Sequence, residues 1–139
     1  MPKVADYMVL RDKEAEVSLE ESLSLIFTFP ADAVEVSGAV QRPILMFKVR
    51  SRGESLNATL WLNGDDPIVT LYNSEPMRPR TYHEVLSFDQ VLAKSTNTLY
   101  FAANEGDPDA KFFISDIVIW FQRDAFWADG QAEGTLDYP

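Results

Sequence analysis

A short alternating segment that ends in an Asn-Gly pair constrains the fold of this chain most. In residues 58–64, alanine and leucine occupy every second position, and Thr59 and Trp61 lie between them. A period of two is typical of a β-strand with one buried face. The pair Asn63-Gly64 is the strongest short-range signal for a tight reversal between antiparallel strands. We therefore expect this segment to form the middle of an antiparallel sandwich.

Other segments repeat this pattern at short spacing, with turn residues between them. They are residues 23–29, 44–50, 68–72, 82–88, 97–103 and 112–122. The last of them is expected to bury one face, formed by Phe113, Ile117, Ile119 and Phe121. Asp89 can cap one short helix at residues 90–94, and no helix of ordinary length is expected. The prediction is an all-β chain, an antiparallel β-sandwich or jelly roll of about eight strands with at most one short helix.

The length of 139 residues suits a single domain with its own hydrophobic core. We expect an N-terminal arm or edge strand at residues 1–16 and one sandwich domain at residues 17–123. Residues 124–139 contain glycines and acidic residues and are expected to form a loosely held tail.

Charge and cysteine content exclude several classes of partner and site. A net charge of −10 at pH 7 would repel a phosphate backbone, so we expect no nucleic-acid partner. The absence of cysteine excludes disulfides, thiolate metal sites and a cysteine nucleophile. No signal peptide and no apolar run long enough to insert into a membrane are visible. The expected protein is soluble and cytoplasmic by default, although a trimmed secreted chain would look the same.

Catalytic motifs are sparse in the sequence. His83 is the single histidine, and no serine lies in a Gly-x-Ser-x-Gly elbow that would accompany it in a triad. The sequence has no phosphate-binding glycine loop and no histidine-rich metal motif. We predict that this protein is not an enzyme.

The succession of strand motifs resembles that of a known fold. The motifs are Phe-Thr-Phe-Pro at 27–30, an apolar strand at 44–49, Leu-Trp-Leu-Asn-Gly at 60–64, Asn-Thr-Leu-Tyr-Phe at 97–101 and a closing strand at 114–120. Residues 23–122 thus resemble the galactose-binding-like jelly roll, and within it the non-catalytic sugar-binding domain of family 2 glycoside hydrolases. The resemblance implies a non-catalytic, lectin-like module that binds carbohydrate.

The resemblance also implies a structural calcium ion, which carbohydrate-binding modules of this superfamily often hold. Its ligands there come from a Glu-Ala-Glu-like segment near the N-terminus and from an aspartate that opens the last strand. Glu14, Glu16 and Asp116 stand in comparable order here. Carboxylates are hard oxygen ligands of the kind that calcium prefers. Alternatively, the two glutamates are solvated surface acids and Asp116 is a polar residue on the outer face of a strand.

Exposed aromatic rings are the candidate contacts for a sugar ring. Trp61 lies opposite the core-facing leucines of its strand, so an exposed ring there would offer a stacking platform. Packing beneath a covered outer face is the alternative, both for Trp61 and for Trp120. Polar groups near Trp61 or beside the long loop that ends near residue 80 would complete such a site. The candidate ligand-binding residues are Trp61, Asn63, Asp65, Arg80, Tyr82 and His83.

Two functions from different classes follow from these observations. In the first, the chain is a carbohydrate-binding module. In the second, it is a structural or protein-interaction subunit of a homo-oligomeric assembly and has no small-molecule ligand. An exposed edge strand or an aromatic patch would support such a homo-oligomer. The expected partner is therefore a carbohydrate or another protein.

Overall fold

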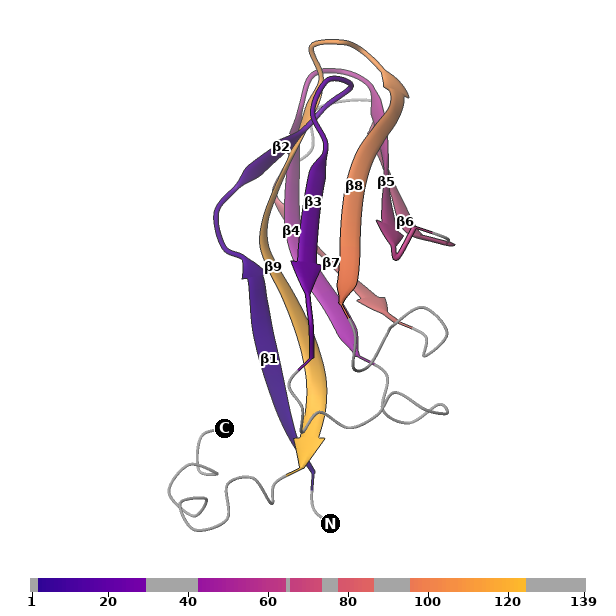
Figure 1. Ribbon diagram of the computed structural model, residues 1–139. Helices are drawn as coiled ribbons and strands as arrows, with labels where there is room; N and C mark the ends of the chain where they lie inside the picture. The colour runs from indigo at the N-terminus through magenta and orange to yellow at the C-terminus, as the bar shows by residue number, and fades with distance from the viewer. Residues whose placement is uncertain (1–2, 30–42, 65, 74–77, 87–95, 125–139) are drawn as a thin grey trace.

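Two antiparallel β-sheets face each other in the computed structural model (Figure 1). The structure describes residues 3–29, 43–64, 66–73, 78–86 and 96–124. In these residues the strands are β1 (Lys3–Arg11), β2 (Ala15–Val17), β3 (Leu23–Phe27), β4 (Ile44–Arg52), β5 (Leu56–Leu62), β6 (Asp66–Asn73), β7 (Arg80–Val85), β8 (Asn97–Gly106) and β9 (Lys111–Asp124). The all-β prediction is confirmed, with nine strands where about eight were expected. The short helix expected at residues 90–94 lies outside the described residues.

The chain passes repeatedly from one sheet to the other. The five-stranded sheet has the order β1-β9-β4-β7, and β2 pairs with the part of β9 that lies beyond β1. The four-stranded sheet has the order β3-β8-β5-β6. Strand β5, which carries the Asn-Gly turn at its end, is an inner strand of that sheet. No helix in the described part of the chain is long and apolar enough to cross a membrane.

The N-terminal residues belong to the five-stranded sheet. Strand β1 pairs with β9 from Lys3 opposite Asp124 to Arg11 opposite Ile117, so it forms one edge of this sheet. The boundary expected between residues 16 and 17 falls inside β2. Residues 125–139, expected to be a tail, lie outside the described part of the chain.

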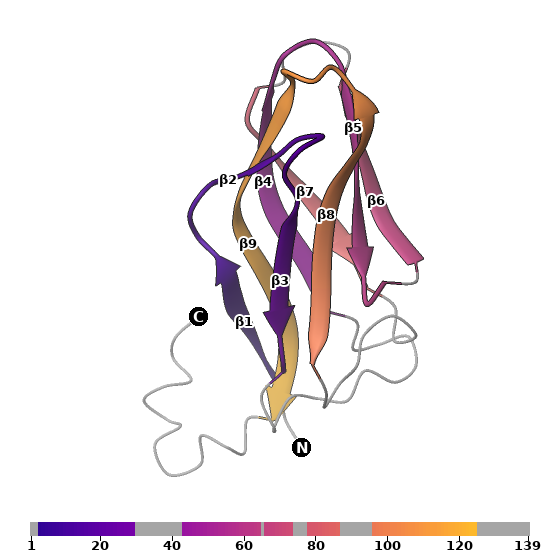
Figure 2. The ribbon, with the colours of Figure 1, turned by 45° about the horizontal axis from the view of Figure 1, so that its top comes forward.

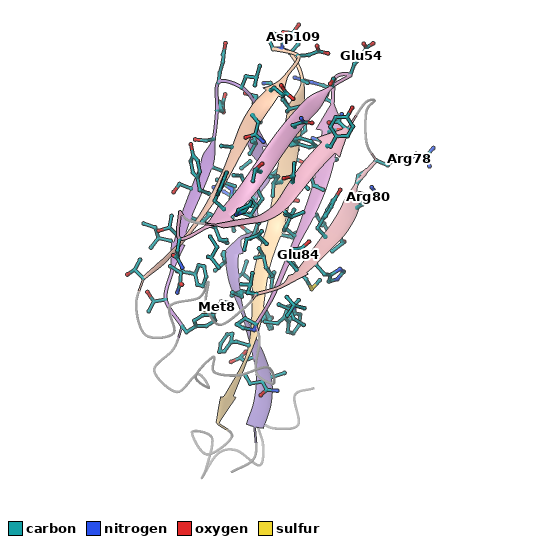
Figure 3. The ribbon with its side chains drawn as sticks, turned by 90° about the vertical axis from the view of Figure 1, so that its right-hand side faces the viewer. Met8, Glu54, Arg78, Arg80, Glu84 and Asp109 are labelled. Atoms are coloured by element: carbon teal, nitrogen blue, oxygen red, sulfur yellow. The ribbon has the colours of Figure 1, made fainter. Side chains whose placement is uncertain are left out.

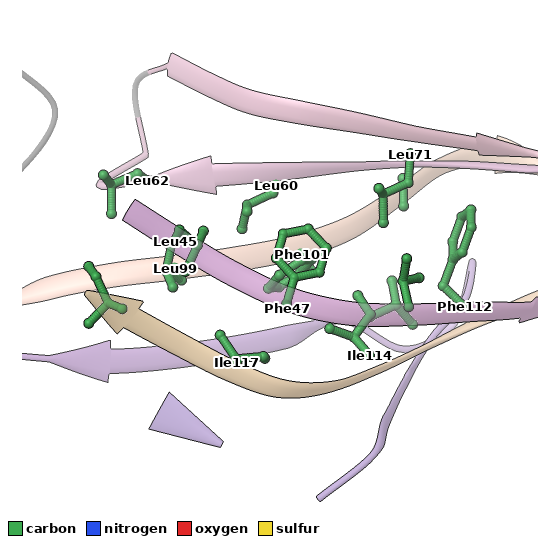
Figure 4. Close-up of a cluster of buried hydrophobic side chains, with 14 of the residues drawn as sticks. Leu45, Phe47, Leu60, Leu62, Leu71, Leu99, Phe101, Phe112, Ile114 and Ile117 are labelled. Atoms are coloured by element: carbon green, nitrogen blue, oxygen red, sulfur yellow. The ribbon is translucent and has the colours of Figure 1, made fainter. Parts of the chain in front are cut away.

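The hydrophobic core fills the space between the two sheets (Figure 4). Phe47 of β4 lies at its centre and is fully buried. Its ring stacks on Tyr82 of β7 at 5.5 Å and meets Phe101 of β8 edge-on at 5.4 Å. Phe47 therefore joins the two sheets, and burial of each such side chain contributes about 1.5–3 kcal/mol.

The prediction that Phe113 faces the core is wrong, because β9 contains a bulge. Lys48 is opposite Ser115 but Met46 is opposite Val118, so one extra residue of β9 stands against β4. Asp116, within the bulge, has a positive φ of 49°. The bulge reverses the alternation, so Phe112 and Ile114 face the core before it, and Ile117, Ile119 and Phe121 face the core after it. The inward positions of these last three residues are confirmed. Phe113 instead lies on the outer face beneath the guanidinium of Arg50, 4.0 Å from the ring centroid.

Candidate functional site

Strands β5 and β8 run side by side in the four-stranded sheet (Figure 2). A hollow of about 420 Å³ opens over them on the outer face of this sheet, and the described residues that line it are Trp61, Gly64, Thr98 and Tyr100. Trp61 and Tyr100 are direct cross-strand partners, so their side chains leave the sheet side by side on the same face. Tyr100 is 40% exposed, and Trp61 is partly buried. The hollow is thus built on two adjacent aromatic side chains.

Strand alternation explains why both rings point away from the core. Each ring stands between two residues of its own strand that face inward and are almost completely buried. These flanking residues are Leu60 and Leu62 on β5 and Leu99 and Phe101 on β8. Their burial holds the two strands in register and leaves Trp61 and Tyr100 on the opposite face of the sheet.

Asn63 fixes the end of β5 against β8. Its φ of 56° and that of Gly64 at 81° are both positive, which suits the tight reversal predicted from the Asn-Gly pair. The Asn63 Oδ1 accepts a hydrogen bond from the backbone N–H of Thr98 at 2.9 Å, and Nδ2 donates to Oδ1 of Asn97 at 3.1 Å. The Asn63 side chain therefore supports the wall of the hollow and is not among the residues that line it. Asp65, the next candidate, lies outside the described residues.

The other three candidate binding residues belong to β7, in the opposite sheet. Figure 3 labels one of them, Arg80. Tyr82 packs its ring on Phe47 at the margin of the core. Arg80 and His83 are exposed. Because none of the three lines the hollow beside Trp61, the structure divides the predicted set between two sheets.

Thr98 and Tyr100 were not singled out in the sequence, although one signal was present. In the motif at 97–101, these two residues alternate with apolar ones, which places them together on one face of a strand. The sequence did not show that this strand would lie next to β5. The pairing of β5 with β8 brings Trp61 and Tyr100 next to each other, and both then line the same hollow.

Each predicted calcium ligand is instead one partner of an ion pair on the five-stranded sheet. The pairs are Glu14 with Arg50 at 2.7 Å, Glu16 with Lys111 at 2.8 Å and Asp116 with Lys48 at 3.2 Å. Within the residues that the structure describes, no three His, Asp or Glu side chains gather closely enough to hold a metal ion. The residues present therefore do not fit the calcium ion that the resemblance implies, because a protein cation already stands beside each carboxylate.

The pair between Glu14 and Arg50 predicts a specific dependence of stability on pH. The Arg50 guanidinium donates two hydrogen bonds of 2.7 Å to this carboxylate and holds the pKa of Glu14 below its ordinary value of 4.5. A lowered pKa stabilises the fold above the pKa of the unfolded chain, and this contribution is lost as the pH falls through the pKa of the folded chain. We expect Glu14→Gln to lower the melting temperature at neutral pH, and the difference from the unmodified chain to shrink on acidification.

Thermal unfolding of both chains from about pH 7 to about pH 3 measures this difference. Glu20→Gln is the matched control, because Glu20 is exposed and takes no part in the pair between Glu14 and Arg50. A gap between Glu14→Gln and the unmodified chain that stays constant over this range would contradict the assignment.

Comparison with known proteins shows the fold of the chain. No family model and no curated protein match the sequence. Solved structures with a similar fold include the following three. Latent dimeric PorU from Porphyromonas gingivalis has a TM-score of 0.63 at 11% identity over 90% of this chain. The C-terminal domain of the sugar-binding protein EclA has a TM-score of 0.51 at 14% identity over 86% of this chain and 79% of its own. The CBM36-1 domain of a multidomain xylanase from the hindgut metagenome of Trinervitermes trinervoides has a TM-score of 0.50 at 10% identity, covering 84% of this chain and 96% of its own.

The chain corresponds to only 13% of the length of PorU. In contrast, it matches most of the sugar-binding domain of EclA and nearly all of the xylanase module. These likenesses agree with the two-sheet antiparallel β-sandwich of this chain and confirm the predicted fold class. At 10–14% identity they extend to the fold alone.

Proposed function

We propose that this chain is a non-catalytic carbohydrate-binding module whose ligand stacks on Trp61 and Tyr100. The observation that carries the proposal is the hollow of about 420 Å³ built on these two paired rings. Two of the similar folds belong to a sugar-binding protein and to a module of a xylanase, which supports a carbohydrate as the ligand class.

The chemistry of the lining suits a sugar ring. The C–H groups on one face of a pyranose pack against an aromatic ring, while its hydroxyls need hydrogen-bond partners at the edge. Directly opposed residues on paired antiparallel strands have Cβ atoms about 4.5–5.5 Å apart, so Trp61 and Tyr100 offer two neighbouring side chains on which a sugar can stack. The Trp61 indole N–H and the hydroxyls of Tyr100 and Thr98 supply polar contacts around it.

The same lining supports binding without catalysis. Hydrolysis of a glycosidic bond requires a carboxylic acid and a second carboxylate or an equivalent nucleophile near the bond. Among the residues that the structure describes, those that line the hollow include no carboxylate, and His83 is on β7 in the other sheet. A sugar held on Trp61 and Tyr100 therefore meets no acid–base pair from this lining.

Calorimetric titration with a panel of mono- and oligosaccharides tests the proposal. We expect one sugar class to bind, and Trp61→Ala to raise its dissociation constant at least about tenfold, because the stacking contact is lost. Tyr100→Ala should have a similar effect. The matched control is Tyr72→Ala, because Tyr72 is an exposed tyrosine of the same sheet, on β6, that does not line the hollow.

Failure of every sugar to bind would contradict the proposal, as would equal affinity of Trp61→Ala and the unmodified chain. Repeating the titration with a chelator examines the implied calcium ion. We expect the affinity and the melting temperature to stay unchanged, since Glu14, Glu16 and Asp116 are already paired with cations. A drop in melting temperature on chelation would show that a metal ion stabilises the fold.

A further inference from the structure

The outer face of the five-stranded sheet carries two rows of side chains that cross four strands, and the proposed sugar site uses none of them. The strand register sets the order in each row (Figure 1). One row is Tyr7, Trp120, Ile44 and Val85, and the other is Val9, Val118, Met46 and His83, in each case on β1, β9, β4 and β7. We name these eight residues the four-strand face.

The four-strand face is unusually apolar for a surface exposed to water. Five of the nine large hydrophobic side chains that are exposed in the described residues belong to it. They are Tyr7, Val9, Ile44, Val85 and Trp120, with exposed fractions between 37% and 59%. Single exposed hydrophobic residues are ordinary on a protein surface, whereas five that share one face of a sheet are typical of a surface that binds another protein.

The polar group of the central tryptophan is already satisfied within the chain. The Trp120 indole N–H donates to Sδ of Met46 at 2.9 Å, and the Tyr7 ring packs against Trp120 with 5.1 Å between centroids. The Trp120 indole N–H therefore needs no hydrogen-bond partner from outside the chain. A second hollow, of about 250 Å³, opens beside Trp120 between Ala5, Ile44 and Gln122 and can admit an apolar side chain of a partner.

The net charge of the chain restricts which of its surfaces can meet a second copy. At pH 7 the chain has a net charge of −10, so two copies repel each other wherever acidic surfaces meet. None of the eight residues of the four-strand face is an acid, a lysine or an arginine. In a dimer with a two-fold axis, both copies use the same surface, so this surface must be complementary to itself. A face without acidic residues, lysine or arginine brings no like charges together across such an axis.

We propose that two copies of this chain associate through the four-strand face, sheet against sheet, about a two-fold axis. Sheets that pack face to face lie about 10 Å apart with their inner side chains interdigitated. Trp120 and Tyr7 of each copy would then lie near the centre of the interface, where aromatic residues are enriched.

Sedimentation velocity from micromolar to hundreds of micromolar protein tests this proposal. We expect the unmodified chain to sediment with twice the mass of one chain at the higher concentrations. The double variant Val9→Lys/Val85→Lys should raise the dimer dissociation constant at least about tenfold, because it buries four lysines per interface. Both positions are more than half exposed, so the variant should fold, which circular dichroism verifies.

Ile26→Lys/Tyr72→Lys is the matched control, with the same change of charge at two exposed apolar residues of the four-stranded sheet. It should dimerise like the unmodified chain. Because the chain has no cysteine, Val118→Cys gives a second measurement: oxidation should link two copies through Val118→Cys but not through Ile26→Cys.

Three results would overturn the proposal. The first is a monomer at every concentration, and the second is a dimer that the Val9→Lys/Val85→Lys variant leaves intact. The third is a monomer that dimerises only after residues 125–139 are removed, which would show that the chain's own C-terminal residues occupy the face.

Discussion

Replacing Phe47 with alanine is expected to lower the free energy of unfolding by about 3–5 kcal/mol. Phe47 is fully buried, and its ring touches Tyr82 in the same sheet and Phe101 in the other. Its removal therefore opens a cavity between the two sheets and takes away two aromatic contacts, in addition to the lost hydrophobic burial. Urea unfolding followed by circular dichroism measures the change.

Two further variants make this result specific to the core. Phe47→Leu retains most of the buried volume, so we expect a smaller loss than for alanine. Ile26→Ala removes an apolar side chain that is 70% exposed on β3 and should change the stability by less than about 0.5 kcal/mol. A loss for Phe47→Ala close to that of Ile26→Ala would contradict the position of Phe47 at the centre of the core.

Alternation in the sequence predicted the faces of strands where the backbone is regular. It placed Leu60 and Leu62 inward and Trp61 outward on β5, and the structure agrees. The same rule misplaced Phe113, because a bulge shifts the period by one residue and leaves no mark in hydrophobicity. The extra residue, Asp116, has the positive φ that a short polar side chain tolerates, but aspartate is common in turns and strands alike.

The candidate site depended on contacts between strands that are distant in sequence. Trp61 could be proposed from its own strand, whereas its neighbour Tyr100 is 39 positions later and joins it only through the pairing of β5 with β8. Glu14 shows the same limit. Its position in the N-terminal segment matched a calcium ligand by resemblance, but its partner Arg50 comes from β4 and converts the carboxylate into half of an ion pair.

The two proposed surfaces lie on different sheets of the sandwich, so one does not block the other. Trp61 and Tyr100 are on the four-stranded sheet, and the four-strand face belongs to the five-stranded sheet. A dimer through the latter would leave both sugar sites open, and two linked sites bind a repetitive polysaccharide more tightly than either alone. Val9→Lys/Val85→Lys should therefore weaken retention on a polysaccharide while leaving the affinity for a short soluble sugar unchanged.

Replacing Asn63 with alanine is expected to lower the free energy of unfolding by about 2–3 kcal/mol. The side chain makes two hydrogen bonds to β8, to the N–H of Thr98 and to the Asn97 amide, and both are lost. In addition, a φ of 56° is tolerated by asparagine but strained for alanine. Urea unfolding measures the total, and Asn63→Gly separates the two causes, since glycine removes the hydrogen bonds but accepts the positive φ.

We expect Asn63→Gly to be more stable than Asn63→Ala. The difference in the free energy of unfolding between these two variants measures the backbone strain. The difference between the unmodified chain and Asn63→Gly measures the two side-chain hydrogen bonds. Because Thr98 and Gly64 line the hollow, loss of the Asn63 contacts should also weaken sugar binding, although Asn63 itself is not part of the lining. Equal stability of the alanine and glycine variants would show that the turn changes its conformation when the asparagine is lost. If both variants are as stable as the unmodified chain, the two hydrogen bonds of the Asn63 side chain do not hold the end of β5 against β8. The hollow would then not depend on the Asn63 side chain.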